Sequence, residues 1–349
     1  MDYSNYLKLP QLLSLQELES HKRTGQAAHN EMLFIIIHQS YELWFKQILH
    51  EVMAIKEKLG QPFVQQSSLS FIVSKLKRVN IILQQLVDQI SIMETLSTVD
   101  FLEFRHHLVP ASGFQSVQFR QLEAHLGLKF SQRMSLEKAF LKQRLDHQQY
   151  QQIEQLDQSA SLLELVDTWL ARFPLLEQKE YWQDYQAAVE QMLDLEAKII
   201  SNNTQQDDRQ IQFEQKNLQM NRQHFQVLFD EKAYQDSENK ISRKAMLSAL
   251  FIHLNRDYPL LALPFQLLEG LVEIDEWLTL WRQRHALMVQ RILGNKVGTG
   301  GSSGHHYLGE TVKKNRIFAD FFNLTSFLLP QNQLPKLNAE LKELLAKEI

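Results

Sequence analysis

The sequence predicts an all-α protein. Only 11 glycines and 8 prolines interrupt its 349 residues, and apolar residues recur at spacings of three and four. That spacing gathers apolar side chains on one face of a helix, whereas a strand would need a period of two. We therefore expect helices along nearly the whole chain and almost no room for strands.

The longest runs with helical spacing have recognisable ends. The first run, 31–59, stops at Gly60, and Pro62 follows; glycine and then proline are typical of a helix C-terminus. The polar stretch SNNTQQDD at 201–208 reads as a loop between two later runs. The same spacing predicts further helices over 67–92, 135–156, 162–173, 181–200, 207–229, 242–254, 268–293 and 313–328.

The length allows one or two domains, and we expect a single domain over 1–349. The stretch 133–230 is rich in glutamine and charge and contains no glycine. It is interpreted as a helical excursion in the middle of the chain. No repeat of fixed period is evident.

Composition excludes several classes of function. A net charge of -4 gives no electrostatic reason to bind nucleic acid or an anionic membrane. The longest strongly apolar stretch, 33–37, is far too short to span a bilayer, and the chain begins with polar sequence and not with a signal peptide. We expect a soluble, cytoplasmic protein with no nucleic-acid or membrane partner.

The absence of cysteine limits the metal chemistry. With no cysteine the chain forms no disulfide, iron–sulfur site, c-type haem linkage or thiolate-ligated haem. Any metal must be held by histidine or carboxylate.

One candidate site lies in the first long run. Phe34, His38, Glu42 and Phe45 follow at spacings of four and three, so they share a helix face. A histidine one turn from a phenylalanine suits the wall of a pocket for an aromatic ligand. The alternative is a core histidine bonded to a backbone carbonyl.

A second candidate site surrounds Arg105. An apolar stretch, 101–104, precedes this arginine, and Pro110 ends or bends the helix after it. Ser112 and Gly113 then offer a hydroxyl and backbone N–H groups to a ligand. Arginine beside such a turn is suited to bidentate capture of a carboxylate, although a surface salt bridge also explains it. Glu103 and His106 form one ExxH pair, but a di-iron bundle needs a second one, which is absent.

The third candidate is His285. Apolar residues surround it on its helix face, and such a wall fits a flat macrocycle with the imidazole as the proximal ligand of haem iron. Ordinary core packing gives the same pattern. Arginines flank these apolar residues on the helix, and they either meet haem propionates or face solvent. The apolar positions are Leu278, Trp281, Met288, Val289 and Ile292, and the arginines are Arg282, Arg284 and Arg291.

The stretch GTGGSSG at 298–304 begins thirteen residues after His285. It matches neither nucleotide-binding fingerprint. Glycine and serine are typical of a flexible linker, but between two helices of one domain a lid that orders over a ligand explains them better. Thr299 would then bring a hydroxyl and an N–H group to that ligand.

Three of these segments, with YSNYLKLPQLL near the N-terminus, closely resemble the tryptophan 2,3-dioxygenase family. They are LFIIIHQSYELWFKQILHE, FLEFRHHLVPASGFQSVQFR and RHALMVQRILGNKVGTGGSSG. The resemblance runs from about residue 3 to 325 and is weakest in the helical excursion. It implies an all-helical, homotetrameric haem dioxygenase fold with haem b, ferrous when active. It also implies that L-tryptophan and O2 are converted to N-formyl-L-kynurenine, the first step of the kynurenine route.

The resemblance also assigns roles by position. His285 matches the proximal haem ligand and His38 the distal histidine that bonds the indole nitrogen. Arg105 matches the partner of the substrate carboxylate, and Thr299 lies beside the substrate's ammonium and carboxylate. The remaining substrate-binding positions that it implies are Phe34, Ile35, Ile36, Ile37 and Phe101, together with Tyr3 and Tyr6 on an N-terminal arm, 1–20, that reaches a neighbouring subunit. Ser112, from the turn after Pro110, is a further expected substrate-binding residue.

The sequence departs from the family pattern at three positions. Ser4 replaces a common glycine in the arm, His305 replaces a common tyrosine after the loop, and Gly309 stands where arginine is frequent. The alternative function is that of a related haem enzyme that inserts one oxygen atom into an indole. A haem sensor or carrier is a weaker alternative, because bare haem binding requires neither Arg105 nor Thr299.

Overall fold

The computed structural model describes residues 1–133, 135–173, 178–203, 207–294, 309, 311–312 and 314–347. Within these ranges the secondary structure is helical and contains no strand, which confirms the predicted fold class. The chain forms two compact units. Unit 1 comprises 1–55, 75–162 and 273–317, and unit 2 comprises 56–74, 163–272 and 318–349.

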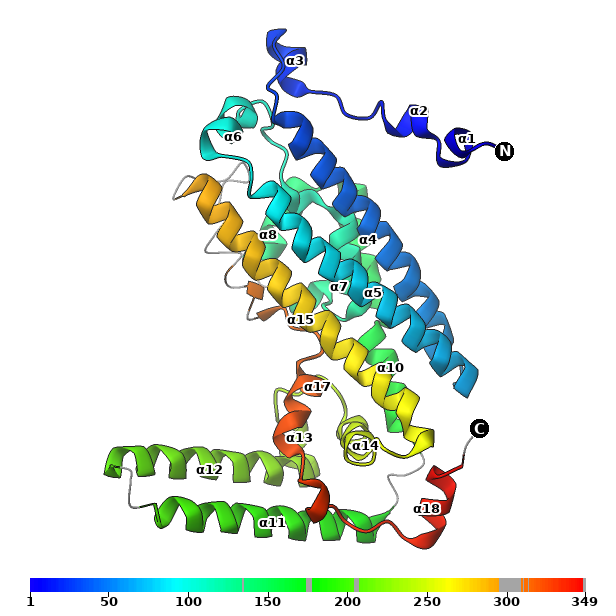
Figure 1. Cartoon of the computed structure of the whole chain (residues 1–349), viewed down its shortest axis with the longest axis vertical. Helices are drawn as coiled ribbons and strands as arrows, with labels where there is room; N and C mark the ends of the chain where they lie inside the picture. Colours follow the sequence, from blue (N-terminus) through cyan, green and yellow to red (C-terminus); the bar gives the residue numbers. More distant parts are fainter. Residues whose placement is uncertain are drawn as a thin grey trace. The chain divides into compact units, whose positions relative to one another are not determined.

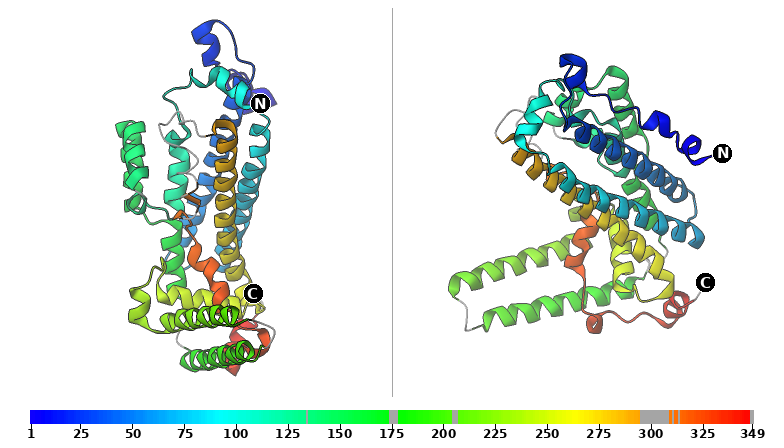
Figure 2. Two further views of the ribbon diagram at one scale, coloured as in Figure 1. Left: turned by 90° about the vertical axis from the view of Figure 1, so that its left-hand side faces the viewer. Right: turned by 45° about the horizontal axis from the view of Figure 1, so that its top comes forward.

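Unit 1 is built around parts of three long helices that lie side by side (Figures 1 and 2). Residues 31–55 come from α4 (Glu31–Leu59), 75–93 from α5 (Gln66–Met93) and 273–293 from α15 (Pro259–Leu293). Buried Ile37, Ile90 and Met288 join the three helices in one apolar core. The shorter helices of this unit are α1 (Tyr3–Leu7), α2 (Leu9–Leu12), α3 (Glu19–Thr24), α6 (Thr98–Arg105), α7 (Val117–Leu126), α8 (Ser135–Arg144) and α9 (His147–Gln155).

Hydrogen bonds from side chains set the ends of the short helices near the core. Ser97 and Asp100 form a capping box at the start of α6, and Ser116 caps α7 by accepting from the backbone N–H of Phe119. α7 ends at Leu126, and the residue that caps it, Gly127, has a φ of 148° that disfavours a side chain. These caps fix where the two helices begin beside α4 and α15.

Unit 2 contains an antiparallel pair of helices, α11 (Lys179–Ser201) and α12 (Asp208–Phe229) (Figure 1). Arg222 of α12 bridges the pair by contacting Glu190 and Asp194 of α11. Asp320 accepts hydrogen bonds from the backbone N–H groups of Lys240 and Ile241. The other helices are α10 (Leu162–Ala171), which begins at the unit boundary, α13 (Glu231–Gln235), α14 (Arg243–Leu254), α17 (Ala319–Asn323) and α18 (Ala339–Leu345).

Three predicted helices differ from those observed. The run 135–156 is broken before α9, because Asp146 forms a capping box with Gln149 and starts a new helix. The run 268–293 begins earlier, at Pro259, where a proline needs no N–H. In the described part of 313–328 the helix starts only at 319, because the Ile317 N–H donates to Asp275 Oδ1 at 2.8 Å and not to a helical carbonyl.

The predicted excursion 133–230 divides between the units: α8 and α9 belong to unit 1, and α11 and α12 to unit 2. The single-domain organisation stays a prediction. In the described part of the chain, no helix has the length and apolar character needed to cross a membrane.

Candidate functional site

Unit 1 contains a cavity of about 290 Å³. Helices α4, α5, α6, α7 and α15 all contribute to its wall, and most of that wall is apolar. Two histidines, His38 of α4 and His285 of α15, line this same cavity. Its apolar lining consists of Phe34, Ile37, Phe45, Ile90, Met93, Phe101, Phe114, Phe119, Trp281, Met288, Val289, Ile292 and Leu293.

The imidazole of His285 stacks on Trp281, one turn earlier on α15. The ring centroids are 5.1 Å apart and the planes 16° from parallel. Its Nδ1 is buried and has no hydrogen-bond partner among the described residues, and the side chain lines the cavity. Burial, with a smaller contribution from His38, lowers the pKa of His285 to about 4. The ring is therefore neutral at pH 7 and keeps a lone pair for a metal.

This arrangement fits haem. A neutral imidazole is the protein ligand that haem iron takes in many proteins, and the apolar wall around His285 matches the faces of a macrocycle. One end of the cavity is charged, which suits the carboxylate edge of such a group. The residues at that end are Arg120, Glu123, Arg282, Thr311 and Asn315.

The orientation of His38 is set by its own helix. Its Nδ1 lies 2.7 Å from the carbonyl oxygen of Phe34, and the two rings are 4.2 Å apart. Because a carbonyl only accepts, Nδ1 carries the proton and Nε2 is left as an acceptor. The side chain is exposed to the cavity, yet burial by the surrounding wall lowers the pKa of His38 below 6.5, against the opposing effects of Phe34 and Glu42. His38 is neutral at pH 7.

The other positions on α4 that were predicted to bind substrate divide into two groups. Phe34 and Ile37 line the cavity, and Ile37 is buried. Ile35 is half-buried and Ile36 is exposed, and neither is among the lining residues. The helical period explains this division, since four successive residues cannot share one face.

Phe101 and Ser112 also line the cavity. Phe101 lies on α6, with its ring 5.7 Å from that of Phe34. Ser112 is held in a tight turn: its N–H donates to Gln115 Oε1 at 2.8 Å, and its hydroxyl accepts from the Phe114 N–H. The turn therefore presents small polar groups at the cavity wall, as the sequence predicts.

Several predicted site residues are not brought to the cavity within the described part of this chain. Arg105 is half-buried in the last turn of α6 and is not among the lining residues. Tyr3 and Tyr6 lie on α1 and are 74% and 69% exposed. Thr299, with the rest of 298–304, lies outside the described residues.

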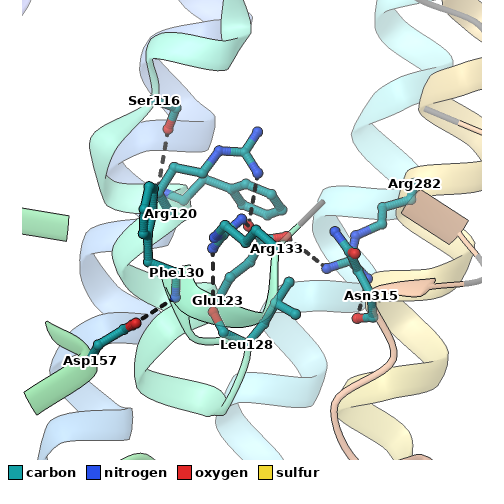
Figure 3. A network of polar contacts seen from close by, with 10 residues as sticks. Ser116, Arg120, Glu123, Leu128, Phe130, Arg133, Asp157, Arg282 and Asn315 are labelled. Atoms are coloured by element: carbon teal, nitrogen blue, oxygen red, sulfur yellow. Dashed lines mark hydrogen bonds and ion pairs between the residues drawn. The ribbon is translucent and has the colours of Figure 1, made fainter. Parts of the chain in front are cut away.

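The structure adds a charged network at the cavity wall that sequence reasoning missed (Figure 3). Glu123 of α7 accepts from Arg120 and Arg133, both at 2.8 Å, and from Arg282 of α15 at 2.9 Å. Burial alone would raise the pKa of Glu123, but the three guanidinium charges outweigh it and hold that pKa well below its usual range. The sequence signal for part of this network is the spacing of three between Arg120 and Glu123 on one helix face.

Comparison with known proteins identifies the family. The family model described as tryptophan 2,3-dioxygenase matches residues 1–328. Proteins named tryptophan 2,3-dioxygenase from Alteromonas mediterranea and Dictyostelium discoideum are 47% and 46% identical, covering 96% and 98% of this chain and 94% and 87% of their own length. The Mus musculus protein of that name is 38% identical, covering 96% of this chain and 84% of its own length.

Enzymes of this family use haem and O2. The match is consistent with a neutral histidine in an apolar cavity, and it extends over nearly the whole chain. The chain therefore belongs to the tryptophan 2,3-dioxygenase family and has the haem-dependent activity of that family, the oxidation of tryptophan by O2.

Proposed function

We propose that the cavity lined by His38 and His285 is the site at which L-tryptophan is converted to N-formyl-L-kynurenine. The observation that carries this proposal is the presence of two neutral histidines, from α4 and α15, on one largely apolar cavity. His285 is the residue that would hold haem b, through its neutral imidazole. When bound, haem supplies the iron and the activation of O2.

His38 orients the substrate. Its Nδ1 proton is committed to the Phe34 carbonyl, so Nε2 is placed to accept the indole N–H. A neutral indole bound in this way keeps its electron-rich C2–C3 bond, and no proton has to leave before oxygen is added. The role is positioning by one hydrogen bond, and its energetic contribution is that of such a bond.

The apolar wall excludes water from the reacting groups. Phe34 and Phe101 pack against each other beside His38, with ring centroids 5.7 Å apart. A dry pocket favours the flat indole ring and protects reactive oxygen species from side reactions. Ile35 and Ile36 lie between Phe34 and Ile37 on α4, but they do not line the cavity in this chain.

Three residues bind the polar end of the substrate. Arg105 pairs with the carboxylate, Ser112 lies beside it, and Thr299 brings a hydroxyl from the glycine–serine loop. Tyr3 and Tyr6 complete the site of a neighbouring subunit in a homotetramer. Their exposure on α1 supports this role, because an exposed apolar arm gains order by docking.

The base of the arm is tied to the helix that carries His38. Gln16 donates to Gln39 Oε1 at 2.7 Å, and Gln39 donates to the Leu15 carbonyl at 3.2 Å. The arm thus leaves α4 from a fixed point next to the site.

The enzyme acts in the cytoplasm, where it catalyses the first step of tryptophan degradation by the kynurenine route.

Two measurements test this function. The visible spectrum of the purified holoenzyme is expected to show histidine-ligated haem and to change on addition of L-tryptophan. With labelled O2, both labelled atoms are expected in N-formyl-L-kynurenine, since the reaction joins L-tryptophan and O2 without another reductant. One labelled atom, or turnover only with a reductant, would instead indicate the enzyme that inserts a single oxygen atom.

A further inference from the structure

An aromatic ring holds the imidazole of His285. In many proteins a metal-bound histidine is oriented by a carboxylate or carbonyl that accepts from its second ring nitrogen. In the described part of the chain, Nδ1 of His285 is buried and has no hydrogen-bond partner. Trp281, one turn earlier on α15, stacks on the imidazole instead, with ring centroids 5.1 Å apart and planes 16° from parallel. The plane of the His285 ring therefore depends on the indole beside it.

Trp281 is itself restrained by three further aromatic rings. Tyr41 and Phe45 of α4 meet the indole edge-on, with centroid distances of 6.2 and 6.5 Å and planes at 63° and 85°. Phe119 of α7 packs against the indole at 5.0 Å. Aromatic pairs at these distances attract when they are offset or edge-on, as they are here. An indole packed in this way offers His285 a rigid surface.

Tyr41 joins this group of rings to the other two long helices of the unit. Its hydroxyl donates to the Leu86 carbonyl of α5 at 2.7 Å, while its ring contacts Trp281 of α15. Tyr41 follows three residues after His38, and both side chains line the cavity. The helix that carries His38 therefore also restrains His285, through Tyr41 and Trp281.

We propose that Trp281 is a positioning residue, whose stacking sets the plane in which the His285 imidazole meets haem, in place of a hydrogen bond to Nδ1. The inference rests on the proposed function, in which His285 holds the haem. A histidine whose second nitrogen donates to no carboxylate or carbonyl gains no extra basicity and remains a neutral ligand. Packing against Trp281 is then what controls the orientation of the ring at the iron.

The test uses two variants of the full chain loaded with hemin. Trp281→Leu keeps an apolar side chain but has no flat ring, whereas Trp281→Phe keeps a ring that can stack. The measurements are the iron–histidine stretching band in the resonance Raman spectrum of the ferrous protein and the release of hemin to excess apomyoglobin. Trp281→Leu is expected to shift and broaden the band and to release hemin about two- to tenfold faster, the scale of one stacked aromatic pair. Trp281→Phe is expected to stay close to the wild type in both.

Trp277→Leu is the matched control. It removes an indole from the same helix one turn earlier, and Trp277 is half-buried like Trp281 but does not line the cavity. The control is expected to leave both the band and the release rate unchanged. The thermal midpoint of each variant is measured alongside, because a loss of stability alone does not move the iron–histidine band.

The outcomes separate this inference from the proposed function. If Trp281→Leu has the same band and release rate as Trp277→Leu, Trp281 is ordinary cavity wall and the inference is wrong, while the function stands. A band altered equally in Trp281→Phe and Trp281→Leu would also overturn it, because stacking would not be the cause. If the wild-type chain gives no histidine-ligated haem spectrum, the proposed function fails first. Should Trp281→Leu not fold, Trp281→Met, which also has no flat ring, takes its place with the same expectations.

Discussion

At the scale of single residues, His285 has the most specific role. Its Nδ1 finds no partner in the described part of the chain, and its neutral ring faces a cavity whose other histidine lies on a different helix. His285→Ala is expected to lose most haem or to hold it weakly and without activity, as judged by the ratio of haem to protein. His253→Ala is a suitable control, since that histidine, whose Nδ1 lies 2.8 Å from the Ala249 carbonyl oxygen, does not line the cavity. A normal five-coordinate histidine–haem spectrum in His285→Ala would remove this residue from the ligand role.

His38 has two possible roles that differ in magnitude. A general base that removes the indole proton contributes on the order of 10²–10⁴ in rate. An acceptor that orients a neutral indole contributes about 0.5–1.5 kcal/mol, roughly a factor of two to ten. The Nδ1 contact with Phe34 and the lowered pKa fit the second role, so His38→Ala is expected to retain measurable kcat/KM.

A methylated substrate distinguishes the two roles of His38 further. 1-Methyltryptophan has no indole N–H proton. In the proposed binding mode its methyl group would collide with Nε2 of His38 in the wild type. His38→Ala makes room for that group, so the ratio of kcat/KM for tryptophan over 1-methyltryptophan is expected to fall. A loss beyond roughly a thousandfold with tryptophan, at normal haem content, would assign His38 to proton removal instead.

Arg105 is assigned by resemblance and not by its place in the cavity wall. If it pairs with the substrate carboxylate in a water-poor site, Arg105→Ala is expected to cost about 2–5 kcal/mol in kcat/KM, the scale for truncating one partner of a buried charge pair. Tryptamine has no carboxylate and is expected to be a poor substrate of the wild type. The assignment would not survive equal turnover of tryptamine and tryptophan by the wild-type enzyme.

At the scale of elements, periodicity predicts the long helices well. α4 and α5 start and end within one residue of the predicted runs, because each has an apolar face that repeats over many turns. Short helices carry too few turns for such a signal, and side-chain caps decide their ends. The capping box at Asp146 therefore starts a new helix at a point where periodicity alone predicts one continuous helix.

The proposed function of the arm is expected to be separable from haem binding. Removing residues 1–9 deletes α1 and the start of α2 but leaves Gln16 and its contact with Gln39. KM for tryptophan is therefore expected to rise while haem content and the thermal midpoint stay near those of the full chain. Unchanged kinetics in the shortened protein would show that the arm does not complete a site.

At the scale of the whole molecule, the sequence predicted the family and the activity but not the charged wall. The blocks that carry the resemblance to the family are each continuous in the sequence, so they can be recognised along the chain. Arg282 and Glu123, in contrast, are 159 residues apart and meet only through the packing of α7 and α15. A pair at that separation leaves no local pattern, and only Arg120 and Glu123, three residues apart, give a helix-face signal.

The proposed homotetramer makes one further demand, that the arm of one subunit completes the site of another. Tyr3 and Tyr6 are exposed on their own chain, which is what donation to a neighbour requires. A mixed oligomer tests this directly. One subunit lacks residues 1–9 but keeps His285; the other keeps its arm and carries His285→Ala, so only the first binds haem.

Each subunit type alone is expected to be weakly active. The first type lacks the arm, and the second type, which carries His285→Ala, lacks haem. Co-expressed under two affinity tags and purified as mixed oligomers, they are expected to show turnover per haem well above that of the arm-deleted protein, with KM returning toward that of the full chain. The reason is that the intact arms of the haem-free subunits dock into the armless haem sites. If every arm instead folds onto its own subunit, the mixed oligomer keeps the high KM of the arm-deleted protein, and trans donation is excluded. Native mass measurement of the same sample is expected to give four chains.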